Sequence, residues 1–374
     1  MILWWTKGFP QTSSTRICGN DVKCDIVSNR SVTSKYKVQA YLFYGSNIDF
    51  EDLPLPRKAK DNIWGLFHEE SPRNVERLMH EPILKLFNFS STFSRYSDVP
   101  FPLQHLFSLP EITSKQYFVE TSKKNALLAE IAPIMYIQSD CETSTERDAY
   151  VKELMKYIKI DSYGTCLNNI KLDEKFQVDY LNHLNDDDFL NFIARYKFVI
   201  AIENGVCEDY VTEKLWRALK IGTVPIYFGS PSVKDWLPNE KSAILLQNHN
   251  TPQKLKEHID DLLKNDTMYE QYLEHKIKQV IKNKNLIFEF HKRPWAADAL
   301  QTAQEFECYI CEKVHENLQG KIHKAHHLTK KHYDCPKPVS ALTLDVNPEN
   351  SWVFSWQTAR VQAEELYKKI VNEH

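Results

Sequence analysis

The residues that most clearly suggest chemistry are an acid and a base side by side at the start of an expected helix, in Thr212-Glu213-Lys214. The surrounding segment, DYVTEKLWRALKIG, has the pattern of a helix that Gly222 ends. A cation is disfavoured at the N-terminus of a helix, whereas the free N–H groups there bind anions. Lys214 therefore indicates an external anion such as a diphosphate. The alternative is a solvated first turn, capped by Asp209 or Thr212.

A second cation has the same placement in a neighbouring βα unit. A strand expected over 133–138 is followed by Ser139, Asp140 and a polar loop, and Arg147 lies in the first turn of a helix expected over 146–158. Arginine is suited to bidentate contacts with phosphate. Taken alone, Arg147 is better explained as an ordinary surface arginine. Two cations placed alike in adjacent units predict one shared anionic ligand.

A pair of carboxylates follows a strand expected over 63–68, in Glu69-Glu70-Ser71-Pro72. Ligands of open α/β sheets bind beyond the carboxyl ends of the strands. Because adjacent strand residues point to opposite faces, at most one of the two carboxylates is expected to face a cleft. Such a carboxylate could act as a general base that deprotonates an acceptor hydroxyl. A solvated acidic turn before proline is the alternative.

Two patterns suggest metal sites, and each has a simpler explanation. Residues 186–188, Asp-Asp-Asp, contain a D-x-D pattern that could hold Mg²⁺ with substrate phosphates, but they directly precede a helix expected over 186–196 and are better explained as its cap. With Arg147 and Lys214 available to neutralise phosphates, no metal is required.

The second pattern is Cys308-x2-Cys311 followed by His323 and His327, which has the outline of a zinc finger. The interval from Cys311 to His323 is one residue shorter than in that motif. Disulfides to the N-terminal cysteines Cys18 and Cys24 explain the pair equally well. We expect no metal, and we expect the histidines of this region to lie in a solvated basic segment; they are His323, His326, His327 and His332.

The elements that must position these residues alternate between strands and helices of 10 to 15 residues, which is typical of βαβ units on a parallel sheet. We expect an α/β protein with three parts: 1–125, 126–300 and a C-terminal extension over 301–374 whose pattern dissolves beyond residue 312. The expected strands are 37–44, 63–68, 132–140, 197–204, 223–230 and 242–248, with a third early strand inside 83–97. The expected helices are 146–158, 186–196, 209–222 and 251–266, the last capped by Thr251 with Pro252 at its first position.

Length and composition indicate a globular protein of two domains. The chain has 374 residues, of which 42% are apolar and 26% charged, and its net charge of −3 argues against a nucleic-acid binder. No apolar run approaches the roughly 18 to 20 residues of a membrane span, and the N-terminal MILWWTKGFP resembles neither a signal peptide nor an anchor.

Cysteine usage and sequons favour the secretory pathway. The cysteine count of eight is even, as a disulfide framework in an oxidising compartment requires. Three N-x-S/T sequons, at Asn29, Asn88 and Asn265, are candidate N-glycosylation sites. If this location is correct, we expect a targeting segment upstream of Met1.

The segment from Glu203 to Gly229 carries a longer pattern, E-N-x4-D-Y-V-T-E-K-L followed by G-T-V-P and a glycine. This pattern resembles the signature of the α1,3-fucosyltransferase family. The segments HEESP, FNFSSTFSRYSD, RDAYVKELMKYI, IDSYG and FECYIC match as well, so that the resemblance covers about residues 1–312 and, more loosely, DCPKP around Cys335. Two positions depart from the family pattern: Ile202 replaces the usual Phe, and Gly205 the usual Ser.

The resemblance implies two Rossmann-like domains that face each other across a cleft, the GT-B arrangement. It also implies metal-independent transfer of L-fucose from GDP-fucose with inversion and without a cofactor. Position by position, Glu70 matches the proposed catalytic base, and Arg147 and Lys214 match the contacts to the diphosphate. The residues implied to hold the nucleotide and the fucose are Asn204, Tyr210 and Glu213, and loops with Ser139 and Tyr163 are implied to line the donor pocket.

The family also implies disulfides from Cys308 and Cys311 to Cys18 and Cys24, with the pairing order open, and an N-terminal membrane anchor in the Golgi or endoplasmic reticulum that this sequence lacks. The most similar members imply that the acceptor is a Ser or Thr hydroxyl of a folded secretory glycoprotein domain, such as an EMI module. The broader family implies GlcNAc in N-glycans or lactosamine instead. A glycoprotein that binds GDP-fucose without catalysis is the alternative outside enzymes.

Overall fold

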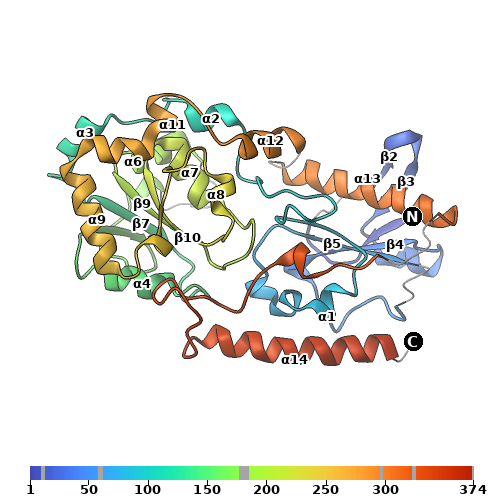
Figure 1. Cartoon of the computed structure of the whole chain (residues 1–374). Helices are drawn as coiled ribbons and strands as arrows, with labels where there is room; N and C mark the ends of the chain where they lie inside the picture. The colour runs from blue at the N-terminus through green and yellow to red at the C-terminus, as the bar shows by residue number, and fades with distance from the viewer. Residues whose placement is uncertain (10–12, 58–61, 177–184, 295–297, 322–325, 373–374) are drawn as a thin grey trace.

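The chain folds into two parallel-rich sheets that lie side by side, each with helices against it (Figure 1). The computed structural model describes residues 1–9, 13–57, 62–176, 185–294, 298–321 and 326–372. One sheet has six strands in the order β2-β3-β1-β4-β5-β6, and the other has five in the order β11-β10-β9-β7-β8. Every neighbouring pair is parallel except β2 with β3. The α/β fold expected from the sequence is confirmed.

The first sheet is covered on both faces, as parallel sheets generally are. On β5, Phe67 faces helix α13 (Ala299–Leu318): its ring centroid lies 6.3 Å from that of Phe306 in α13 and 6.2 Å from that of Trp4 in β1. Trp64 and Leu66 face the apolar cluster on the other side of the sheet, which contains residues of helix α14 (Ser351–Asn372). The strands are β1 (Ile2–Trp4), β2 (Ser14–Ile17), β3 (Lys23–Val27), β4 (Ala40–Tyr44), β5 (Ile63–His68) and β6 (Phe89–Thr92).

Two pairs of helices cover the two faces of the second sheet. Helices α4 (Arg147–Leu154) and α9 (Pro252–Lys264) bury their apolar residues in one cluster, and α6 (Asp187–Ala194) and α7 (Glu213–Ile221) bury theirs on the other side of the sheet. The expected cap of α9 is confirmed, because Thr251 accepts a hydrogen bond from the Lys254 amide. The strands are β7 (Ile134–Gln138), β8 (Ile160–Gly164), β9 (Phe198–Ile202), β10 (Val224–Phe228) and β11 (Ile244–Leu245).

Short helices fill the connections. The segment between the sheets contains α2 (Leu109–Thr113) and α3 (Thr121–Leu127), and α2 packs on α7. The buried Lys124 of α3 donates to the carbonyl oxygens of Tyr196 and Gly222 at 2.8 Å and so fixes that helix to the second sheet. The remaining short helices are α1 (Glu81–Leu84), α2 (Leu109–Thr113), α3 (Thr121–Leu127), α8 (Val233–Trp236), α10 (Asp266–Glu270), α11 (Glu274–Ile277) and α12 (Lys284–Lys292), and the 3-10 helix η4 spans Pro72–Met79.

The C-terminal region corrects the expectation that the pattern dissolves beyond residue 312. Helix α13 continues to Leu318, and α14 (Ser351–Asn372) lies along η4 and α1 below the first sheet (Figure 1). Between the two helices, Leu328 and Tyr333 are fully buried, although His326 and His327 are exposed. The helical signal of α14 was missed, although its buried face carries Val353, Ala359, Ala363 and Ile370 at helical spacing. His323 lies outside the described residues.

Candidate active site

Three loops that follow strands β5, β7 and β9 meet where the two sheets face each other. The Tyr210 hydroxyl donates to the Glu70 carboxylate at 3.0 Å, and Ser71 Oγ donates to Asn204 Oδ1 at 3.0 Å. These contacts join residues far apart in the sequence. The carboxyl ends of β5 and β9 are therefore adjacent, which is where α/β proteins bind their ligands.

Of the two adjacent carboxylates after β5, only Glu70 faces this junction. Glu69 turns away and accepts a hydrogen bond from the Tyr44 hydroxyl, and burial raises the pKa of Glu69. Glu70 is exposed apart from its contact with the buried Tyr210. The expectation that at most one carboxylate faces the cleft agrees with this arrangement.

The start of α7 is built around a buried carboxylate, Glu203, whose side chain is inaccessible to solvent. It accepts hydrogen bonds from the Thr212 amide at 2.8 Å and from the Thr212 hydroxyl at 2.6 Å. Thr212 is the N-cap, as one alternative held. Asp209 is not: its carboxylate accepts instead from Arg95, at 2.6 to 3.0 Å.

Lys214 has two carboxylate partners of its own. Its Nζ lies 3.0 Å from Glu213 and 3.6 Å from Glu203. Burial lowers the pKa of Lys214, but the two carboxylates raise it by more, so that the pKa lies above its usual range. The positive charge of Lys214 is thus neutralised by two carboxylates of the protein itself. Its position alone does not require an external anion, contrary to the simplest interpretation of the sequence.

Glu213 lies at the edge of the same junction, with 32% of its side chain exposed. Burial opposes its ionisation, but the charges of Lys214, His105 and Arg217 together hold its pKa well below its usual range. His105, from the segment after β6, approaches Glu213 to 4.0 Å. Glu213 is therefore a carboxylate with one side open to a ligand.

Arg147 is buried at the start of α4, with only 1% of the residue exposed. It donates to the carbonyl oxygens of Asp140 and, at 3.4 Å, of Ile202, and its Nη2 lies 3.6 Å from the Asp140 carboxylate. Arg147 and Lys214 are close enough for each charge to affect the other. The two cations expected to share one anion do lie in one region.

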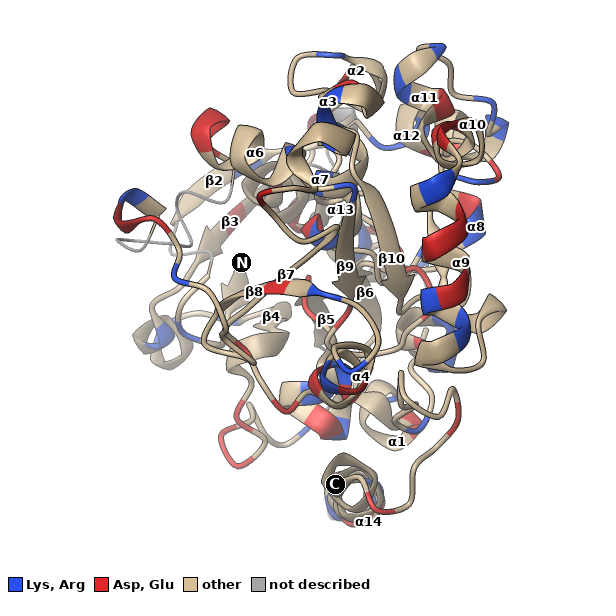
Figure 2. Cartoon of the chain, turned by 90° about the vertical axis from the view of Figure 1, so that its left-hand side faces the viewer, with Lys and Arg blue, Asp and Glu red and all other residues tan. Residues whose placement is uncertain are grey.

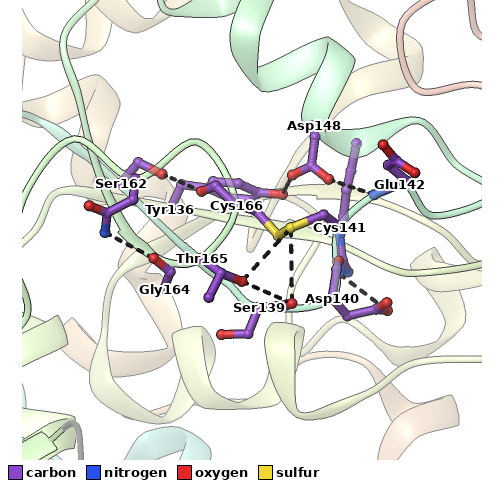
Figure 3. Close-up of a disulfide and its surroundings, with 12 residues drawn as sticks. Tyr136, Ser139, Asp140, Cys141, Glu142, Asp148, Ser162, Gly164, Thr165 and Cys166 are labelled. Atoms are coloured by element: carbon purple, nitrogen blue, oxygen red, sulfur yellow. Dashed lines mark hydrogen bonds and ion pairs between the residues drawn. A yellow bond between two sulfur atoms is a disulfide. The ribbon is translucent and has the colours of Figure 1, made fainter.

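A disulfide between Cys141 and Cys166 fixes the loop between β7 and α4 (Figure 3). The exposed Ser139 lies beside it, and its carbonyl oxygen accepts from the Thr165 hydroxyl at 3.0 Å. In α4, Asp148 accepts from Tyr136 and from the Glu142 amide. The loop is therefore held from both sides.

Tyr163 does not join the other candidates. It lies within β8 rather than on a loop, and its side chain packs in the cluster beside α6. Its hydroxyl forms a 2.8 Å hydrogen bond with that of Tyr196. The expectation that Tyr163 lies on a loop is wrong, because it belongs to β8, where its side chain turns toward the helices; that it lines the donor pocket stays a prediction.

Four disulfides use all eight cysteines. The implied N-terminal links are confirmed as Cys18–Cys308 and Cys24–Cys311. The zinc-finger alternative fails for the Cys308 and Cys311 pair, since neither offers a thiolate. The disulfides Cys141–Cys166 and Cys207–Cys335 were not predicted.

The aspartates of the D-x-D pattern at 186–188, the other candidate metal site, also have partners within the protein. In α6, the Asp187 carboxylate accepts from the Tyr117 hydroxyl at 2.5 Å, and Asp188 pairs with Lys175 at 3.1 Å. The side-chain clusters of the described residues that could hold a metal contain Cys24 with Cys311, or Cys141 with Cys166, which are disulfide-bonded.

The sequons differ in accessibility. Asn29 and Asn265 are exposed. Asn88 is 4% exposed; its oxygen accepts from the Trp64 amide at 2.8 Å, and its amide nitrogen donates to the His326 carbonyl oxygen at 2.9 Å. A glycan on Asn88 would have to displace these buried contacts, so its role here is structural.

The surface carries charges of both signs. Lys lies beside Asp or Glu on both α8 and α9 (Figure 2). Within the described ranges, we find no helix with the length and apolar character of a membrane span.

Comparison with known proteins assigns both sheets. Residues 123–331 match the C-terminal model of glycosyltransferase family 10 (fucosyltransferase), and residues 1–104 match the fucosyltransferase N-terminal model. The chain is 41% identical over 378 residues to GDP-fucose protein O-fucosyltransferase 3 of Xenopus laevis, which covers 99% of this chain and 80% of that protein. It is 40% identical over 379 residues to the Homo sapiens protein of the same name, with 98% and 78% covered.

Among solved structures, a crystal structure of an α1,3-fucosyltransferase with GDP-fucose aligns with a TM-score of 0.44 and 17% identity, over 72% of this chain and 80% of that chain. The sequence matches, which span both sheets and nearly the full length, decide the assignment: the chain belongs to glycosyltransferase family 10, the fucosyltransferases.

Proposed function

We propose that this fucosyltransferase moves L-fucose from GDP-fucose to a hydroxyl of a secretory glycoprotein, in one inverting step. The observation that carries the proposal is the hydrogen bond between Tyr210 and Glu70, at 3.0 Å. It joins the exposed carboxylate in the half of the chain that holds the first sheet to the loop over 203–212 in the half that holds the second. We call this the signature loop, because it carries the family pattern. The acceptor side is then residues 1–125, and the donor side is residues 126–300. Residues 301–374 return to the acceptor side and contribute to both sides.

In the proposed reaction, Glu70 accepts the proton of the acceptor hydroxyl as a general base. The hydroxyl oxygen forms a bond to the anomeric carbon of fucose while the bond from that carbon to the diphosphate oxygen breaks, and the bonding electrons leave with GDP. Arg147 and Lys214 stabilise the negative charge that develops on the leaving diphosphate. The ionised Glu213 supports the electron-poor fucose ring.

Asn204 and Tyr210 hold the nucleotide and fucose in this proposal, and the exposed Ser139 lies on the same donor side. The two cations perform the charge neutralisation that a metal performs in other glycosyltransferases. No cofactor is therefore part of the reaction, and activity is expected to persist in a chelator.

For the acceptor, the names of the relatives support a protein hydroxyl: two proteins about 40% identical are called GDP-fucose protein O-fucosyltransferase 3. We propose Ser or Thr on a folded secretory domain, such as an EMI module. Four disulfides support a location in the lumen of the secretory pathway, in the Golgi or endoplasmic reticulum.

The decisive experiment supplies GDP-fucose with a folded EMI-type domain and, separately, with a GlcNAc-terminated N-glycan or lactosamine, and locates fucose by mass spectrometry. Fucose on Ser or Thr of the folded domain is the expected result. Fucose on GlcNAc alone would replace the acceptor assignment by α1,3-fucosylation. Binding of GDP-fucose without transfer to any acceptor would indicate a non-catalytic glycoprotein instead.

A further inference from the structure

Arg73 contributes a second guanidinium group near Arg147, from the opposite half of the chain. Arg73 lies in η4, after the Glu70-Ser71 turn, and its Nη2 is 2.5 Å from Asp140 Oδ2. The Nη2 atom of Arg147 is 3.6 Å from the same oxygen. Two arginines from two halves thus converge on one carboxylate.

The two guanidinium groups share a single carboxylate. The side chain of Arg73 is 10% exposed and that of Arg147 is 1% exposed, whereas Asp140 is 50% exposed. One half-exposed carboxylate therefore faces two buried cations. In addition, the Nε atoms of both arginines are buried and have no hydrogen-bond partner within the described ranges. Buried donors are nearly always satisfied, so two orphaned donors on neighbouring guanidinium groups indicate a missing acceptor.

Arg73 lies beside the loop that follows β9. A cavity of about 20 Å³, room for roughly one water molecule, is lined by Arg73, Ser71 and Gly205, among others. Ser71 also bonds Asn204, and the Arg73 guanidinium lies 5.3 Å from the centre of the Trp352 ring. The Trp352 indole donates at 2.7 Å to the carbonyl oxygen of Glu142, on the loop that precedes Arg147. Arg73 is thus held in place beside the donor half.

We propose that Arg73 is a further donor-binding residue, which contacts the diphosphate of the nucleotide together with Arg147, and that the Asp140 carboxylate competes with the diphosphate for the two guanidinium groups. The proposal rests on the proposed function, because it takes GDP-fucose as the donor. A diphosphate has more acceptor oxygens than a carboxylate and matches the donor geometry of arginine. Donor binding would then engage both halves of the chain at once.

The alternative role for Arg73 is structural, as an ion pair that only holds the two halves together. The two roles predict different changes in the affinities for GDP and for guanosine. A residue that contacts the diphosphate changes affinity for GDP and leaves guanosine unaffected. A residue that only holds the halves together changes affinity for both ligands alike.

The test is calorimetric titration of the full chain with GDP, GMP and guanosine, for wild type and for Arg73→Gln, Arg73→Lys and Asp140→Asn. Arg77→Gln is the matched control, because Arg77 lies in the same η4 and pairs with the exposed Glu51 at 3.6 Å. We expect Arg73→Gln to weaken GDP about ten- to hundredfold, GMP less and guanosine not at all. Arg73→Lys should retain part of the affinity, Asp140→Asn should bind GDP more tightly, and Arg77→Gln should equal wild type.

Equal losses for GDP and guanosine in Arg73→Gln, or an unchanged affinity for GDP, would overturn the role of Arg73. Weaker GDP binding by Asp140→Asn would refute the proposed competition between the Asp140 carboxylate and the diphosphate. A wild-type protein that fails to bind GDP would refute the proposed function as well, whereas wild-type binding that Arg73→Gln retains in full refutes this inference alone.

Discussion

The hydroxyl of Tyr210 donates a 3.0 Å hydrogen bond to the carboxylate of Glu70, and this bond links the signature loop of the donor half to the proposed base of the acceptor half. Tyr210 is almost fully buried, and burial holds the pKa of its hydroxyl well above the usual range, so it remains a donor at physiological pH. The proposed base is therefore oriented by the half of the molecule that we propose binds the sugar donor.

Glu70→Gln should abolish transfer while GDP binding persists. The amide cannot accept the acceptor proton, and general-base catalysis contributes on the order of 10²- to 10⁴-fold. Steady-state kinetics and calorimetric titration with GDP measure the two effects separately. Glu69→Gln is the control, because that side chain faces Tyr44. Wild-type turnover in Glu70→Gln would remove Glu70 from the role of base.

Lys214→Met should weaken GDP binding about ten- to hundredfold, through loss of a charge-assisted contact to phosphate. Lys220→Met is the matched control, because Lys220 lies on the same helix α7, 3.1 Å from Glu111 and away from the signature loop. Titration of both variants with GDP compares them directly. Because Lys214 is already paired with two carboxylates, an unchanged affinity would mean that its role is purely structural.

Glu203 should make stability depend on pH. Burial raises its pKa from 4.5 to about 6. The protonated form is thus favoured by folding, and that stabilisation is complete below pH 4.5 and lost as the pH rises through 6. The free energy of unfolding of wild type minus that of Glu203→Gln should fall by about 2 kcal/mol between pH 4 and pH 7.5. Denaturant unfolding at the two pH values measures it, and a constant or rising difference would contradict the assignment.

Removal of the Cys207–Cys335 disulfide should lower the free energy of unfolding by about 3–5 kcal/mol, since it closes a long loop with a sequence separation of 128. The double variant Cys207→Ser/Cys335→Ser avoids a free thiol. The comparison is Cys141→Ser/Cys166→Ser, with a separation of 25, which should lose about 1 kcal/mol less. Chemical unfolding of both variants tests the order; a larger loss from the shorter loop would contradict it.

The sequence predicted those elements whose apolar runs are long and uninterrupted. The strand expected over 63–68 is β5 to the residue, and the strands around the signature are present because β9 and β10 are buried on both faces. Strand β1 was missed: Ile2–Trp4 is only three residues long and lies at the chain end, yet it is central in its sheet. Its neighbour β3, and β2 at the edge of the sheet beyond it, mix polar with buried residues and carry little signal.

The candidate site was predictable where chemistry follows local sequence. Glu70, Asn204 and Tyr210 come together, and Glu213 lies beside Lys214. The pair of Arg73 and Asp140, separated by 67 residues in sequence, depends on how the two halves dock, and no spacing rule encodes that contact. The internal partners of Lys214 were missed for the same kind of reason, because Glu203 reaches it only through the fold of the loop.

The C-terminal segment passes from the first half to the second and back. It is bound there by Cys207–Cys335 and by the Ala341 amide, which donates at 2.7 Å to the Thr145 carbonyl oxygen, before α14 returns to the first half. On the opposite edge, α12 contacts α8 and the chain continues into α13 (Figure 1). The halves are thus joined along two edges, so that a swing about a single hinge would have to break the contacts at one of them.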